Sequence, residues 1–96
     1  MTLKDLLSKY IRNTEQVFGE MKTSEATVQI SREAIENVIE TAKRYLEDAK
    51  YYQERKKLET GLASVAYCEG LLDALRLLGM VKFSWPTIKG RRERSS

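Results

Sequence analysis

Apolar residues recur at helical spacing over the first twenty residues of the chain. At about 100° per residue they fall on one side of a helix, while charged residues take the other side. The apolar set is Leu3, Leu6, Leu7, Tyr10, Ile11, Val17, Phe18 and Met21. Thr2 suits the N-cap position, because Asp5 stands three residues later as in a capping box. The pattern predicts an amphipathic helix over residues 2–21.

A second helical pattern follows a polar connection of about residues 22–30. Ser31 suits its N-cap, and Glu33 in the first turn complements the positive end of the helix dipole. One face carries Ile35, Val38, Ile39, Ala42, Tyr45, Leu46, Ala49 and Tyr52. The opposite face is charged, with pairs of opposite sign three and four residues apart. This pattern predicts a helix over residues 31–55.

The third pattern, over residues 59–78, is apolar or small almost all round. Its only charges beyond Gly61 are Glu69, Asp73 and Arg76, which form one stripe, and a helix of this kind is buried by more than one neighbour. Gly61 and Gly70 inside it each cost about 1 kcal/mol relative to alanine, so close approach of a neighbouring backbone is expected there. Gly79 is the expected C-cap in the left-handed conformation.

No glycine or proline marks the turn between the second and third patterns, in the region 53–59. A continuous helix over residues 31–79 is therefore a rival prediction; it would be about 70 Å long and would need a partner chain to cover it. We favour a turn. The resulting fold class is all-α, an antiparallel up-and-down three-helix bundle over residues 1–79. Residues 80–96 form a short C-terminal extension whose basic end is expected to be flexible.

Composition agrees with a single helical domain. The chain has 96 residues, 32% of them charged, and its apolar runs fall far short of the roughly 20 residues that span a bilayer. No uncharged segment within residues 1–20 suggests a secretory signal, and Cys68 is the only cysteine. We expect a cytoplasmic protein with no membrane association, in which Cys68 is a small core residue.

The net charge of +3 comes from the end of the chain. Residues 80–96 hold five basic residues and one acidic residue, whereas residues 1–79 sum to −1. Basic residues near Phe83 and Trp85 are typical of nucleic-acid binding by phosphate contacts and base stacking. These candidates are Lys89, Arg91, Arg92 and Arg94. The favoured interpretation is simpler, namely that Val81, Phe83 and Trp85 fold back over the end of the bundle.

The chain lacks the residues that several kinds of site require. The chain has no histidine, and its five glycines occur singly, so catalytic triads, ordinary zinc sites and glycine-rich phosphate loops are absent. We predict no catalytic residue, no cofactor and no metal. A polar margin beside the core is the remaining small-ligand candidate, and it consists of Tyr45, Asp48, Tyr52, Tyr67, Glu69 and Asp73. The simpler interpretation is that these carboxylates satisfy tyrosine hydroxyls.

The second and third patterns resemble a known archaeal family, number 357 among the domains of unknown function. The resemblance rests on Ala42, Tyr45, Asp48, Ala49 and Tyr52 and on Ala66, Tyr67, Glu69, Gly70, Leu72, Asp73, Ala74, Leu78 and Gly79. It implies an up-and-down three-helix bundle with no established activity. Members commonly show a Gly-Asp turn between the last two helices, where this chain has Arg55, Lys56, Lys57, Leu58 and Glu59.

Our leading functional hypothesis is a non-enzymatic interaction or assembly module. Its concrete form is self-association through the small-residue face of the third helix, which consists of Ala63, Ala66, Gly70 and Ala74. The alternative is RNA or DNA binding by the basic tail together with Arg55, Lys56 and Lys57.

Overall fold

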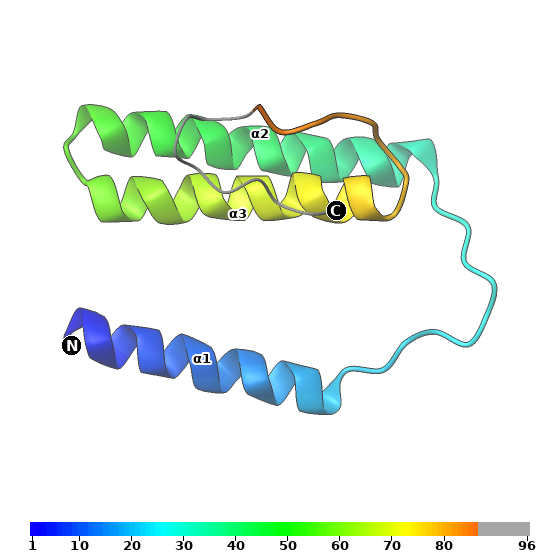
Figure 1. Cartoon of the computed structure of the whole chain (residues 1–96), viewed down its shortest axis with the longest axis horizontal. Helices are drawn as coiled ribbons and strands as arrows, with labels where there is room; N and C mark the ends of the chain where they lie inside the picture. The colour runs from blue at the N-terminus through cyan, green and yellow to red at the C-terminus, as the bar shows by residue number, and fades with distance from the viewer. Residues whose placement is uncertain (87–96) are drawn as a thin grey trace.

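The computed structural model describes residues 1–86, and these form three α-helices and no strand. The helices are α1 (Leu3–Glu20), α2 (Arg32–Glu54) and α3 (Leu58–Leu77). Figure 1 shows α2 and α3 side by side as an antiparallel hairpin, with α1 apart from them at the end of an extended connection. The predicted all-α class and its three helices are confirmed.

The N-termini of α1 and α2 are capped by the predicted side chains. At the start of α1, the Thr2 hydroxyl accepts from the Asp5 N–H at 3.1 Å, and the Asp5 carboxylate accepts from the Thr2 N–H at 3.3 Å. At the start of α2, the Ser31 hydroxyl accepts from the Ala34 N–H at 3.0 Å. Each cap satisfies backbone donors that have no partner inside the helix.

The turn between α2 and α3 is made without glycine. Lys56 adopts the left-handed conformation with φ 61°, and the Lys57 N–H donates to the Tyr52 carbonyl at 2.9 Å. The Lys56 N–H donates to the Gln53 carbonyl at 3.1 Å, which completes a Schellman motif. The rival prediction of one continuous helix is therefore wrong. Gly79, with φ 77°, ends α3 in the same way, as predicted.

Lys56 holds a conformation that costs an L-residue with a Cβ roughly 1–2 kcal/mol and costs glycine far less. We expect Lys56→Gly to raise the free energy of unfolding by about 1 kcal/mol after the entropic cost of glycine is deducted. Urea denaturation followed by circular dichroism measures this. Lys57→Gly is the matched control, because Lys57 has φ −92° and should gain nothing. Equal effects of the two substitutions would contradict the turn geometry.

The core of the hairpin is narrow and consists mainly of small residues. Ala42 of α2 and Gly61, Cys68 and Leu75 of α3 are the buried residues of these helices. A Cβ added at Gly61 would lie 3.3 Å from the Ala49 carbonyl oxygen, so the close approach predicted at this glycine is confirmed. Gly70 is different: it is exposed, and a Cβ there would meet nothing within 4 Å. Among residues 1–86, no atom is a close neighbour of Gly70.

The first helix does not close the predicted bundle. Within the described residues, α1 makes no contact with α2 or α3. The connection between α1 and α2, residues 21–31, is longer than the two to eight residues usual in bundles. Its Val28 and Ile30 side chains are exposed, so they do not hold it against the hairpin. The structure therefore corrects the closed three-helix bundle to a two-helix hairpin with a separate amphipathic helix.

Candidate interaction surfaces on α1 and α3

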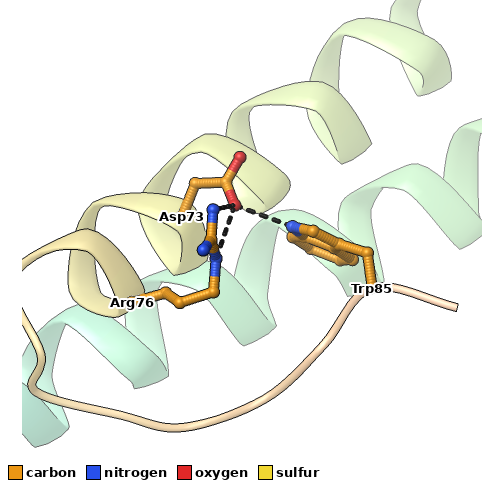
Figure 2. Close-up of polar contacts among 3 residues, drawn as sticks. All are labelled: Asp73, Arg76 and Trp85. Atoms are coloured by element: carbon orange, nitrogen blue, oxygen red, sulfur yellow. Dashed lines mark hydrogen bonds and ion pairs between the residues drawn. The ribbon is translucent and has the colours of Figure 1, made fainter. Parts of the chain in front are cut away.

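The charged stripe of α3 faces the C-terminal segment, residues 80–86. In Figure 2 the Asp73 Oδ1 atom accepts from the Trp85 indole N–H at 2.7 Å and from the Arg76 guanidinium at 3.3 Å. The Asp73 and Arg76 side chains are only 19% and 18% exposed. Phe83 packs edge-to-face on Trp85, with ring centroids 5.0 Å apart. Phe83 and Trp85 fold back onto the helices as predicted, but they lie beside the charged stripe of α3 and not over the end of a bundle.

Trp85 is expected to hold this segment in place, because its indole N–H donates to a half-buried carboxylate. Trp85→Phe keeps an aromatic ring and removes the donor, so we expect a loss of about 1.5 kcal/mol in the free energy of unfolding. A double-mutant cycle with Asp73→Ala, measured by circular dichroism, isolates the interaction. A coupling energy of zero would show that the Asp73 to Trp85 bond does not stabilise the chain.

A side of α3 next to the charged stripe carries no charge between residues 60 and 78. Because successive residues of a helix are about 100° apart, a set of exposed apolar and small side chains of α3 falls on one face. We call this arc the uncharged face, and it consists of Ala63, Ala66, Tyr67, Gly70, Ala74, Leu77 and Leu78. The C-terminal segment lies against the charged stripe on another side of the helix. The four small residues predicted as an interaction surface are therefore all exposed.

α1 presents a second uncovered apolar surface, which we call the α1 stripe. Its members are each 50–71% exposed, and they are Leu3, Leu7, Tyr10, Ile11, Val17, Phe18 and Met21. Three basic and three acidic residues of α1 lie outside this stripe and sum to zero charge. Covering the stripe, about 700 Å² of largely apolar surface, would contribute roughly 15–20 kcal/mol of gross hydrophobic free energy. The sequence pattern identified these residues and assigned them to a core, because a core face and an interface share one periodicity.

The residues of the predicted polar margin contact several different partners. The Tyr45 and Tyr67 rings meet edge-to-face across α2 and α3, with centroids 4.5 Å apart. Tyr52 packs against Tyr51 instead, at 5.4 Å between centroids. Asp73 lies on the other side of α3, with Glu69 at the neighbouring position of the charged stripe, and Asp48 is exposed on α2. Tyr45 and Tyr67 therefore contact each other, whereas Tyr52 and Asp73 contact residues outside the predicted set.

Cys68 is buried between α2 and α3, as its interpretation as a core residue predicted. Burial raises the pKa of the Cys68 thiol above its usual value of 9.0, and the neighbouring Glu69 carboxylate raises it further. A raised pKa in the folded state means that the neutral thiol favours folding, and that this contribution is lost as pH rises through the folded-state pKa. A neutral, buried thiol is a poor nucleophile.

The remaining candidates are basic. Lys89, Arg91, Arg92 and Arg94 lie outside the described residues. Lys56 and Lys57 are exposed in the turn between α2 and α3, and the Arg55 guanidinium lies 3.7 Å from the centroid of the Tyr51 ring. Residues 1–86 contain no group of three or more side chains suited to a metal ion. Across the same residues, no helix has both the length and the apolar character needed to cross a bilayer.

Comparison with known families gives one match. The family DUF357, described as a protein of unknown function, matches residues 9–81. This chain belongs to that family. The match to DUF357 includes most of α1 and all of α2 and α3, and it ends before Phe83 and Trp85. No curated protein and no solved structure gave a significant match. The match thus includes the uncharged face of α3 and the α1 stripe from Tyr10 onward, but not Leu3, Leu7 or the aromatic and basic residues that follow residue 81.

Proposed function

We propose that this DUF357 chain is a non-enzymatic assembly module that associates with itself through its apolar helix faces. One observation supports this proposal above the others. The C-terminal segment occupies the charged side of α3, so the uncharged face is left exposed, and the α1 stripe is exposed as well. Exposed contiguous apolar surfaces on this scale are characteristic of interaction sites.

Gly70 adds a second reason. A glycine inside a helix costs about 1 kcal/mol relative to alanine, and within the described part of one chain nothing lies close enough to Gly70 to require it. A helix from another copy could pack closely against this face because Gly70 has no side chain to keep it away. Ala63, Ala66 and Ala74 extend this surface of small side chains along α3.

The test is a substitution that fills this surface. Gly70→Leu should reduce the mass measured by light scattering to that of a single chain, 11.1 kDa, while the helical circular dichroism signal is retained. Retained helicity is expected because the position is open in the single chain. Gly19→Leu is the matched control: Gly19 is also open, but it lies on the charged side of α1, so its mass should match the unmodified protein. An unchanged mass for Gly70→Leu would contradict assembly through this face.

A second candidate is RNA binding by the basic end of the chain. It is supported by the net charge of +4 on residues 80–96, and by exposed Lys56 and Lys57 at the hairpin turn. Such binding should weaken steeply as salt is raised and should be lost on deletion of residues 91–96. RNA binding that survives the deletion, or that does not respond to salt, would count against this candidate.

A further inference from the structure

We infer that the occupant of the uncharged face is α1 of a second copy, so that two chains exchange their first helices reciprocally. This inference rests on the proposed self-association and specifies its geometry. Two surfaces, the α1 stripe and the uncharged face of α3, are exposed in the part of the chain that the structure describes. Reciprocal exchange would cover both surfaces in both chains and leave neither open.

The two surfaces are complementary in length and shape. α1 has 18 residues and α3 has 20, which correspond to about 27 Å and 30 Å of helix. Large side chains such as Tyr10 and Phe18 project from the α1 stripe, whereas alanine and glycine dominate the middle of the uncharged face. Ridges of large residues pack into grooves between small ones.

Charge favours a second copy over a charged partner. The uncharged face has no ionised group between residues 60 and 78, and the charges of α1 lie outside its stripe and cancel. Contact between these surfaces therefore buries no charge. An anionic membrane or a nucleic acid would gain no electrostatic attraction from the zero net charge of α1, because that attraction comes from excess lysine and arginine.

Area favours α1 over α3 as the occupant. The seven residues of the α1 stripe expose roughly 100 Å² each, so covering one stripe removes about 700 Å² from water, and a standard interface buries about 800 Å² per partner. Contact between the uncharged faces of two α3 helices would leave both α1 stripes exposed to water. Exchange of two α1 helices covers two stripes, which is enough for a stable dimer.

The connection permits the exchange. Residues 21–31 can extend to about 35 Å, and Figure 1 shows them as an extended chain that carries α1 away from the hairpin. Within the described residues no contact ties α1 to the hairpin of its own chain. Exchange of an identical element between chains is a low-cost route to a dimer, and this connection is long enough for α1 to reach a second copy.

Cross-linking of full-length chains tests the inference. In a Cys68→Ala background, one chain carries Tyr10→Cys in the middle of α1 and another carries Ala66→Cys in the middle of α3. The two chains are mixed in denaturant, refolded together and treated with a short bismaleimide. We expect a cross-linked product of twice the chain mass that requires both chains. Arg12→Cys, on the charged side of α1, replaces Tyr10→Cys in the control and should give at least tenfold less product.

Other outcomes would overturn the exchange in distinguishable ways. If a chain with both Tyr10→Cys and Ala66→Cys cross-links within itself, and the mixed single variants do not react, α1 docks on its own hairpin. If Ala66→Cys chains cross-link mainly with each other, two α3 helices pack together, which contradicts the exchange and preserves self-association. A monomeric mass before cross-linking would remove the proposed function together with this inference.

Discussion

Gly61→Leu is expected to lower the free energy of unfolding of the α2–α3 hairpin by about 3 kcal/mol. The reason is the contact at this glycine, where even a Cβ would lie 3.3 Å from the Ala49 carbonyl oxygen and 3.5 Å from the Tyr52 Cβ. The carbonyl oxygen belongs to the backbone of α2, so it cannot rotate away as a flexible side chain would. The two helices must separate at this point, and contacts near the hairpin turn are lost. Urea denaturation followed by circular dichroism at low protein concentration measures the change.

Gly70→Leu is the matched control for this prediction, because it places the same side chain on the exposed side of the same helix. At low protein concentration it should leave the urea midpoint almost unchanged or raise it slightly, since leucine favours helix over glycine. Equal losses at Gly61 and Gly70 would contradict the assignment of one glycine to the hairpin contact and the other to a free face.

Phe18→Glu is expected to weaken self-association at least 100-fold, which corresponds to about 2.7 kcal/mol. Phe18 is 71% exposed in the single chain, so glutamate there should not disturb the fold. In an assembly that covers the α1 stripe, the same carboxylate would lose its water without gaining a partner, and this desolvation is costly. Sedimentation equilibrium of the two proteins measures the change in dissociation constant.

Gln16→Glu supplies the control for charge alone, because Gln16 lies on the polar side of α1. It adds the same charge to the same helix and should change the dissociation constant by less than threefold. Two substitutions with similar effects would indicate general repulsion between chains, and the α1 stripe would not be part of the interface.

The helix ends show how much local structure could be predicted from the sequence. Thr2 with Asp5, Ser31 and Gly79 occupy the caps assigned to them, because each cap is a contact between residues close in the chain. The turn at Lys56 was harder to place. A lysine in the left-handed conformation has no distinctive sequence signal, and tertiary packing of α3 on α2 holds it there.

The sequence showed which residues share one face of a helix, but it did not show whether that face is buried or exposed. Periodicity placed the apolar residues of α1 on one side, yet it could not distinguish a core from an interface, since both need the same spacing. Likewise, close approach of a neighbouring backbone was expected at both Gly61 and Gly70 of α3. The structure confirmed it for Gly61 but not for Gly70. The side of α3 that meets the C-terminal segment depends on one contact between distant residues, Asp73 and Trp85, which no local pattern encodes.

The most direct test of self-association is the mass of the unmodified chain in solution over a range of concentrations. Multi-angle light scattering should give twice the chain mass of 11.1 kDa at high concentration, with a shift toward the single-chain mass on dilution. A mass of 11.1 kDa at every concentration would contradict the proposal that the uncharged face of α3 and the α1 stripe are surfaces of assembly.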